Sequence, residues 1–217
     1  MTALVVAKAP VPGLAKTRLA ATVGDDRAAD IAAAALLDTL DAVATAPFTR
    51  RVVAMTGDIS KAARSEEIRR RLDDFTVIGQ RGGDFGQRLA NAHYDTAAVA
   101  GPQPVLQIGM DTPQISADLL ADCAGRLSPG TAVLGPARDG GWWILGVSDP
   151  TLAGCLTAVP MSRSDTGTLT ATALENAGVP VVFATELADV DTIDDIAFVR
   201  EACRPESRFA LATEGIS

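Results

Sequence analysis

Short aliphatic runs alternate with longer helical segments along most of this chain, and this alternation constrains the fold more than any other feature. The first run covers residues 4–7, and a segment rich in alanine and leucine extends from Asp25 or Asp26 to about Ala46. Further strand-like runs lie at residues 51–55, 75–78, 105–108, 132–134, 142–147 and 179–183. Further helical segments are expected at residues 60–72, 85–98, 116–125, 165–177 and from Thr192 onward.

The strand-like runs are continuously apolar, which indicates strands that are covered on both faces. The pattern therefore predicts an α/β protein, a three-layer α/β/α sandwich around a mostly parallel sheet. We expect residues 1–204 to form a single domain and the polar residues 205–217 to form a flexible tail. In such sheets, ligands bind at the carboxyl ends of the strands, so the candidate site residues are sought there.

The net charge of the chain argues against some classes of binding partner. The chain of 217 residues has 19 lysines and arginines against 27 aspartates and glutamates, a net charge of −8. An acidic protein repels nucleic acids and anionic membranes at long range, so neither is expected as a partner. No apolar stretch approaches the about 18 residues of a membrane span. The first nine residues lack the basic leader of a signal peptide, so a cytoplasmic location is expected.

The loop after the first strand gathers positive charge in this acidic chain. Lys8, Lys16 and Arg18 lie within residues 8–18, directly after the first strand-like run. Lysine binds a phosphate as a point charge, and arginine binds it through a planar fork of donors. Pro12 and Gly13 favour an irregular loop between strand and helix. The cluster predicts a phosphate-binding loop, although an exposed basic loop would have the same composition.

Two familiar phosphate-binding loops do not fit this segment. A dinucleotide-binding loop would have the pattern G-x-G-x-x-G, but only one glycine is present. In a Walker A loop, Lys16 and Thr17 would fit the end, but Pro10 and Ala15 stand where glycines are required. Proline also lacks the N–H group that a phosphate cradle uses. Residues 105–111 imitate a Walker B strand, which keeps a P-loop enzyme open as an alternative.

Two aspartates follow strand-like runs and are candidate metal ligands. Asp111 follows the run 105–108, and Asp191 follows the run 179–183 and precedes the last helical segment. Mg²⁺ needs only one or two protein carboxylates when water and substrate phosphate complete its coordination. A turn-forming role for Asp111 and a helix-start role for Asp191 are the structural alternatives. Asp189 is expected to support the loop beside them.

Several sequence blocks resemble a known family. The residues Lys8, Pro10, Pro12-Gly13 and 16–19 (KTRL) are similar to the opening signature of DUF2064, a glycosyltransferase-A-like family of the nucleotide-diphospho-sugar transferase superfamily. Blocks 82–88 (GGDFGQR), 109–113 (GMDTP), 135–141 (GPARDGG) and 189–192 (DVDT) resemble the family in the same order. The family is itself similar to 2-phospholactate guanylyltransferases. The resemblance implies a glycosyltransferase-A-like fold, and in its nucleotidylyltransferase branch Asp111 and Asp191 fall on the metal-binding pair.

The middle blocks are candidates for binding the nucleotide and the acceptor. Gly83, Asp84 and Arg88 are expected to reach the nucleotide, with helix capping as the simpler role for Asp84. The candidates for acceptor binding are Asp139, Gly140, Gly141 and Trp142. Gly140 and Gly141 would also let another chain segment approach closely. Residues 160–166 depart from the family pattern, so the acceptor is not identified.

These features predict a nucleotidylyltransferase that depends on Mg²⁺ or Mn²⁺ and joins a nucleoside triphosphate to a small phosphorylated acceptor or sugar phosphate. Lys16, Arg18 and Asp111 are the expected catalytic residues, with Lys8 assisting at the phosphates. A metal, Lys and Arg can stabilise the leaving pyrophosphate without a side-chain nucleophile. A glycosyltransferase that uses a nucleotide sugar and a non-catalytic nucleotide-binding module are the alternatives. The sequence leaves a homodimer open.

Overall fold

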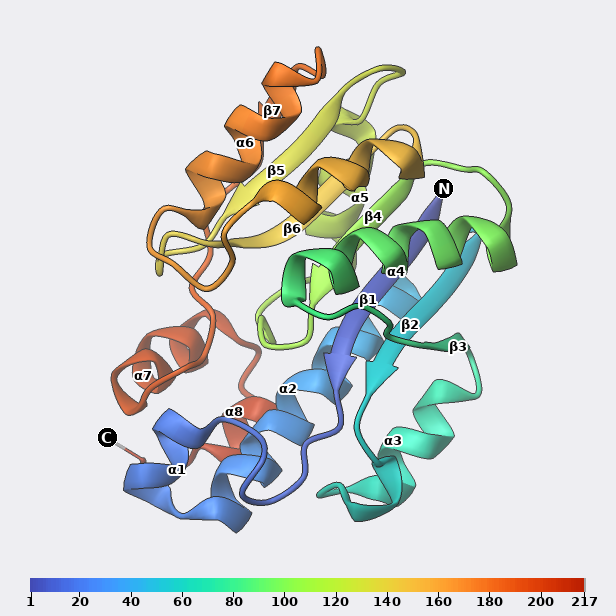
Figure 1. Cartoon of the computed structure of the whole chain (residues 1–217). Coiled ribbons are helices and arrows are strands. Elements are labelled where there is room, and N and C mark those ends of the chain that lie inside the picture. The colour runs from blue at the N-terminus through green and yellow to red at the C-terminus, as the bar shows by residue number, and fades with distance from the viewer. Residues whose placement is uncertain (217) are drawn as a thin grey trace.

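The computed structural model describes residues 1–216. Its centre is one seven-stranded sheet (Figure 1). The strand order is β3-β2-β1-β4-β6-β5-β7. β6 is antiparallel to β4 and β5, whereas the other pairs are parallel. The mostly parallel sheet is thus confirmed. The strands are β1 (Thr2–Lys8), β2 (Arg50–Thr56), β3 (Thr76–Gly79), β4 (Val105–Gly109), β5 (Ala132–Pro136), β6 (Trp142–Val147) and β7 (Val181–Phe183).

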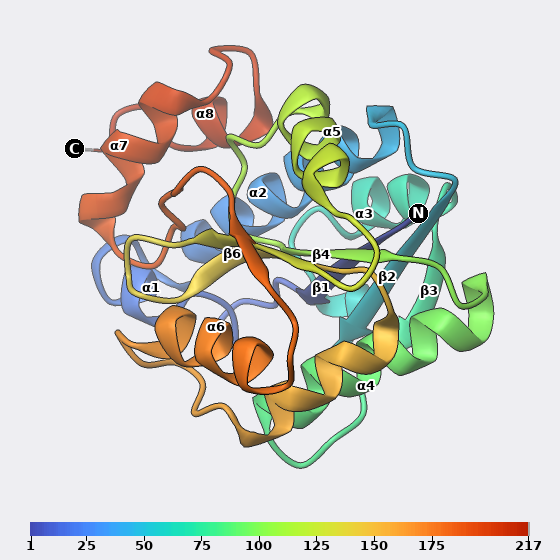
Figure 2. The ribbon, with the colours of Figure 1, turned by 90° about the horizontal axis from the view of Figure 1, so that it is seen from above.

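Helices cover both faces of the sheet, which confirms the three-layer sandwich (Figure 2). α2 (Asp25–Thr45), α3 (Ser65–Leu72) and α5 (Ala117–Arg126) pack on one face. The other face is covered by α4 (Phe85–Ala100), the 3₁₀ helix η2 (Pro150–Ala158) and α6 (Thr166–Asn176). The remaining helices are α1 (Thr17–Val23), the 3₁₀ helix η1 (Ile59–Lys61), α7 (Ile193–Ala202) and α8 (Arg208–Ala212).

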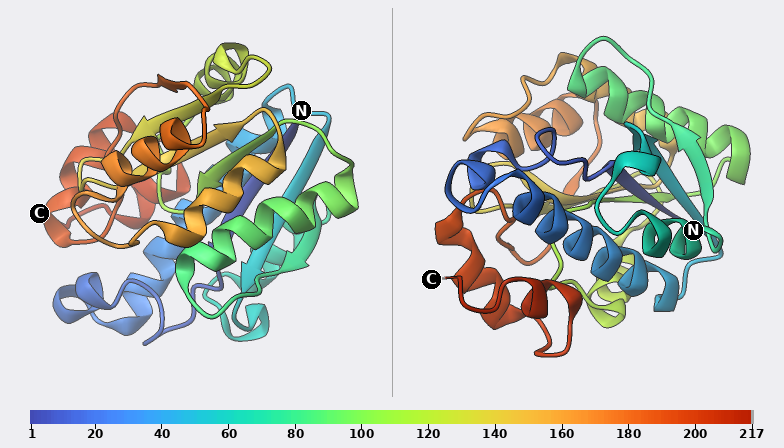
Figure 3. Two further views of the ribbon diagram at one scale, coloured as in Figure 1. Left: turned by 45° about the horizontal axis from the view of Figure 1, so that its top comes forward. Right: turned by 90° about the horizontal axis from the view of Figure 1, so that it is seen from below.

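The expected tail contains a packed helix, so the prediction of a flexible segment at residues 205–217 is wrong for residues 208–212. Ser207 caps α8 by accepting a hydrogen bond from the Ala210 amide at 3.1 Å. Phe209 is 0% exposed and packs in a cluster with α1, α2 and α7. Asp38 of α2 accepts the Phe209 amide at 2.8 Å. Ala210, Ala212 and Thr213 are buried as well, so this short segment is anchored against α2, and Figure 3 (right) shows the C-terminal helix beside α2.

No helix among residues 1–216 is long and apolar enough to cross a membrane.

His93 of α4 is fully buried between this helix and the sheet. Its Nε2 lies 2.9 Å from Oε1 of Gln107 on β4. Burial lowers the pKa of His93 to about 4, against an ordinary value of 6.5, although the Gln107 hydrogen bond opposes this shift. The folded protein therefore holds His93 neutral at pH 7.

This burial predicts a loss of stability in acid. Between pH 6.5 and about pH 4 the unfolded chain binds a proton at His93 that the folded chain does not. The contribution of neutral His93 to the free energy of unfolding is therefore complete above pH 6.5 and decreases as the pH is lowered. The expected decrease between pH 7.5 and pH 4.5 is about 2.5 kcal/mol. Urea unfolding at these two pH values measures the decrease in the free energy of unfolding. His93→Gln is the control, since it removes the titrating group, and an equal acid loss in both proteins would contradict the assignment.

Candidate functional site

A cavity of about 740 Å³ opens over the carboxyl ends of β1 and β4, where the sequence placed the site. A smaller cavity of about 300 Å³ adjoins it, because both are lined by Lys8, Arg18, Met110, Asp111 and Asp191. The larger cavity brings together most of the predicted site residues: Lys8, Arg18, Arg88, Asp111, Asp139, Gly141, Trp142 and Asp191. Lys16 lines the smaller cavity.

The two metal-ligand candidates meet because two loops converge. β4 ends at Gly109, which brings Asp111 to the cavity two residues later. The amide of Val190 donates to the carbonyl oxygen of Asp111 at 3.3 Å and holds the loop before α7 against the end of β4. Asp195 of α7 accepts the amides of Asp191 and Thr192 at 3.0 and 2.7 Å. The start of α7 therefore fixes the backbone of Asp191 next to Asp111.

Lys16 lies between these two carboxylates. Its Nζ donates to Asp111 Oδ2 and to Asp191 Oδ1, each at 2.8 Å, and its side chain is 12% exposed. The residue has a φ of 46°, a left-handed conformation that turns the loop into α1. The Lys16 ammonium thus lies at the position where a cation neutralises both carboxylates.

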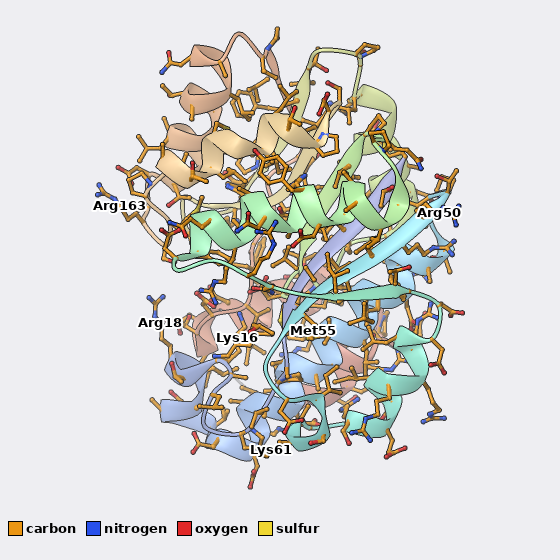
Figure 4. All side chains as sticks on the ribbon, turned by 45° about the vertical axis from the view of Figure 1, so that its right-hand side comes forward. Lys16, Arg18, Arg50, Met55, Lys61 and Arg163 are labelled. Atoms are coloured by element: carbon orange, nitrogen blue, oxygen red, sulfur yellow. The ribbon has the colours of Figure 1, made fainter. Side chains whose placement is uncertain are left out.

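Arg18 is the outer cation of the same loop. Its guanidinium lies 3.5 Å from Asp191 Oδ2, but its side chain is 76% exposed. Figure 4 shows Lys16 further inside the molecule than Arg18, with Arg163 at the same edge of the molecule as Arg18. An exposed ion pair contributes little to stability, so Arg18 is free to bind a ligand.

The charges of the site shift its pKa values in opposite directions. Burial acts to lower the pKa of Lys16, but Asp111 and Asp191 raise it above the ordinary value, so the ammonium stays charged. Burial acts to raise the pKa of Asp191, but Lys16 and Arg18 lower it below its usual range. Asp189 differs, because burial and the nearby carboxylates of Asp111, Asp139 and Asp191 raise its pKa to about 7.

Asp189 joins the two predicted ligands in one carboxylate cluster. One oxygen each of Asp111, Asp189 and Asp191 lies within 4.8 Å of the others. Carboxylate oxygens are the donors that Mg²⁺ and Mn²⁺ prefer, and the position of the Lys16 ammonium shows that the cluster attracts a cation. The residues present therefore fit a divalent metal. The sequence analysis assigned Asp189 only a supporting role.

Five predicted site residues do not line either cavity: Pro12, Gly13, Gly83, Asp84 and Gly140. Gly13 has a φ of 75° and shapes the first loop. Asp84 caps α4 by accepting the Gln87 amide at 2.8 Å, the simpler of its two expected roles. A Cβ on Gly140 would lie 1.9 Å from the carbonyl oxygen of Ser164, so this glycine allows two loops to pack closely.

Other cavity residues escaped the sequence analysis. Thr56, Gln80 and Gln107 line the side of the cavity near β1 and β2, and Met161, Ser162, Arg163 and Ser164 line the other side. The only sequence signal for the second group was its departure from the family pattern. A single glutamine next to or within a strand carries no local signal of function, because its importance depends on the elements packed around it.

A family model described as "Uncharacterized protein conserved in bacteria (DUF2064)" matches residues 39–163, more than half of the chain. The chain belongs to the DUF2064 family. The matched segment of this DUF2064 protein contains Arg88, Asp111, Asp139, Gly140, Gly141 and Trp142. The first loop with Lys16 and Arg18 lies before it, and Asp191 lies after it. A search of curated proteins gives no match.

Solved structures confirm the fold of this DUF2064 protein. A protein of Desulfovibrio desulfuricans G20, assigned to the nucleotide-diphospho-sugar transferases, is 25% identical with a TM-score of 0.83, over 97% of this chain and 92% of that chain. A nucleotidyl transferase of Methanothermobacter is 18% identical with a TM-score of 0.58, over 93% and 96% of the two chains. A 4-diphosphocytidyl-2C-methyl-D-erythritol synthase of Anaerococcus prevotii is 16% identical with a TM-score of 0.58, over 91% and 93%.

Proposed function

We propose that this protein is a Mg²⁺- or Mn²⁺-dependent nucleotidylyltransferase that joins a nucleoside triphosphate to a small phosphorylated acceptor or sugar phosphate. One observation carries the proposal: Lys16 and Arg18 of the first loop meet the strand-end carboxylates of Asp111 and Asp191 at a large cavity. A cationic loop beside a carboxylate cluster suits a triphosphate with its metal. The nucleotidyl transferases among the structural neighbours support the same assignment.

The reaction breaks the bond between the α- and β-phosphates as an acceptor oxygen forms a new bond to the α-phosphorus, and pyrophosphate leaves. Lys16 and Arg18 hold the triphosphate and stabilise the negative charge that grows on the leaving group. Lys8, whose Nζ donates to the Leu14 carbonyl at 2.7 Å, assists them from the start of the loop. No side-chain nucleophile is required, because the acceptor oxygen attacks directly.

Asp111 and Asp191 would hold the metal, with Asp189 beside them as a third donor. When bound, the metal supplies charge neutralisation at the phosphate oxygens.

The loops at the edge of the cavity support nucleotide binding, and their shape depends on Pro12, Gly13, Gly83 and Asp84. Arg88 lines the cavity itself. The acceptor would bind at Asp139, Gly141 and Trp142, which line the larger cavity, and Gly140 supports this part of the site by letting its loop pack closely against Ser164. We further propose that residues 1–204, together with the packed helix α8, act as one nucleotide-binding domain in the cytoplasm.

A glycosyltransferase that uses a nucleotide sugar is the second candidate, favoured by the assignment of the Desulfovibrio neighbour to the nucleotide-diphospho-sugar transferases. Both reactions use the same fold and a metal-bound diphosphate. They differ in the group that moves, because glycosyl transfer leaves a nucleoside diphosphate whereas nucleotidyl transfer leaves pyrophosphate. The ligand that stabilises the protein therefore separates them.

We expect one nucleoside triphosphate to raise the melting temperature in the presence of Mg²⁺ and not in the presence of a chelator. A ligand at 100 times its Kd adds about 2.7 kcal/mol to the stability of the folded state. Thermal melts with the four triphosphates and a set of nucleotide sugars measure the effect. Stabilisation by a nucleotide sugar alone would favour glycosyl transfer, and metal-independent stabilisation by every triphosphate would contradict the metal site.

A further inference from the structure

The Lys16 ammonium lies between the two carboxylates that the proposed function assigns to a metal. Its Nζ contacts one oxygen of each, Asp111 Oδ2 and Asp191 Oδ1, at 2.8 Å. The Lys16 side chain is only 12% exposed, so these ion pairs are screened much less than ion pairs on the surface. The chain itself therefore supplies a cation that neutralises the carboxylate pair.

A metal and the Lys16 ammonium disfavour each other at this pair. A divalent metal bound to the same oxygens would bring two further positive charges next to the ammonium. Like charges repel strongly where water is largely excluded, and the repulsion would remove much of the gain from metal binding. The metal can gain the full attraction of Asp111 and Asp191 only after the ammonium has left them.

The backbone of Lys16 is held in place, so the side chain is the part that can move. Its carbonyl oxygen accepts the Ala20 amide of α1 at 2.8 Å. Ala15 and Leu19 on either side of it are buried. The ammonium, by contrast, is carried on a flexible stem of four carbons. It can leave the carboxylates without any unfolding of the loop or of α1.

The smaller cavity provides the space for this movement. It has a volume of about 300 Å³ and is lined by Lys16 and Arg18 together with both aspartates. Under the proposed function, this is where the phosphates meet the cations of the loop. Phosphate oxygens accept charge-assisted hydrogen bonds as carboxylate oxygens do, so they can replace the carboxylates as partners of Lys16.

We infer that Lys16 is an internal cation that competes with the metal for Asp111 and Asp191, so that metal binding requires the Lys16 ammonium to move out of the pair. This inference rests on the proposed function, which assigns the metal to these two carboxylates. Phosphate favours the outward position of Lys16, so metal and triphosphate strengthen each other's binding. The competition also keeps the carboxylates paired with a cation whether or not a metal is bound.

Lysine acylation at low reagent concentration, read by mass spectrometry, tests the inference, because the chain has only three lysines: Lys8, Lys16 and Lys61. The Lys61 side chain is 73% exposed and serves as the reference. Without metal, Lys16 should react at least about 10-fold more slowly than Lys61, because two carboxylates hold its proton. Saturating Mn²⁺ should raise the rate at Lys16 by at least about 5-fold, because the ammonium is displaced, and leave the rate at Lys61 unchanged.

A pair of variants measures the competition from the side of the metal. Lys16→Met keeps the length of the stem and removes the charge, so Mn²⁺ should bind at least about 10-fold more tightly than to the wild type. Arg18→Met is the matched control, since it removes one cation of the same loop that also pairs with Asp191 but is 76% exposed. It should change Mn²⁺ affinity by less than about 3-fold. Electron paramagnetic resonance measures free Mn²⁺, and circular dichroism checks the fold.

The outcomes separate this competition from the proposed function. Mn²⁺ binding to the wild type without faster acylation of Lys16, or equal affinity in wild type and Lys16→Met, would overturn the competition and leave the proposed function intact. Mn²⁺ binding by Lys16→Met alone would support the competition. Binding by neither protein would reject the metal site of the proposed function, and the competition with it.

Discussion

Asp111→Asn should weaken Mn²⁺ binding by at least about 100-fold while the protein stays folded. Replacing residues that merely orient metal ligands already reduces metal affinity by about 10- to 100-fold, so loss of a charged ligand should do more. Asp111 is half-buried and its side chain faces Lys16, so the amide fits the same space. The free Mn²⁺ signal in electron paramagnetic resonance measures the affinity, and circular dichroism checks the fold.

Two variants control this experiment. Asp139→Asn changes a carboxylate of the same cavity that does not belong to the close cluster of three, so it should bind Mn²⁺ almost as the wild type does. Lys16→Ala removes the ammonium that lies between Asp111 and Asp191, so it should tighten Mn²⁺ binding. Equal affinity in wild type and Asp111→Asn, or weaker binding in Lys16→Ala, would contradict the metal assignment.

The second large effect that we expect is a loss of nucleotide affinity when the cations of the loop after β1 are removed. Replacing both Lys16 and Arg18 with alanine should weaken binding of the stabilising triphosphate by at least about 100-fold, because charge-assisted hydrogen bonds are worth about 1.5–3 kcal/mol each. Calorimetric titration in Mg²⁺ measures this loss.

The matched control is Lys61→Ala with Arg69→Ala, which removes two cations that pair with exposed carboxylates away from the cavity. This control has the same change in net charge, so it separates contact with the phosphates from a general electrostatic effect. Full nucleotide affinity in the Lys16 and Arg18 double variant would reject the phosphate-binding loop.

The sheet could be predicted well because each strand is a continuous apolar run with a clear boundary. All seven strand-like runs form strands, although β7 begins at Val181 where the run was expected to begin at residue 179. The predicted helix over residues 60–72 begins only at Ser65, because Asp58 caps the short η1 turn before it. The helices α1, η2 and α8 were missed, since they are short and depend on tertiary packing.

The site could be predicted only where a residue follows a strand or belongs to a recognisable block. Asp111 and Asp191 come from different strand ends, and the sheet brings them together as expected. The loop that places Asp189 beside them runs along the end of β5, where the Leu187 amide donates to the Pro136 carbonyl. No local pattern encodes that path. Likewise, nothing in the sequence around Gln107 indicates its hydrogen bond with His93, because that contact depends on how α4 packs on the sheet.

The most direct test of the central claim is the release of pyrophosphate from the triphosphate that stabilises the protein, with a panel of phosphorylated acceptors. We expect release in Mg²⁺, none with a chelator, and a rate at least about 100-fold lower in Asp191→Asn, because this variant removes a carboxylate of the metal pair. Binding of the nucleotide without pyrophosphate release, in wild type and Asp191→Asn alike, would show a binding module or a glycosyltransferase and would contradict nucleotidyl transfer.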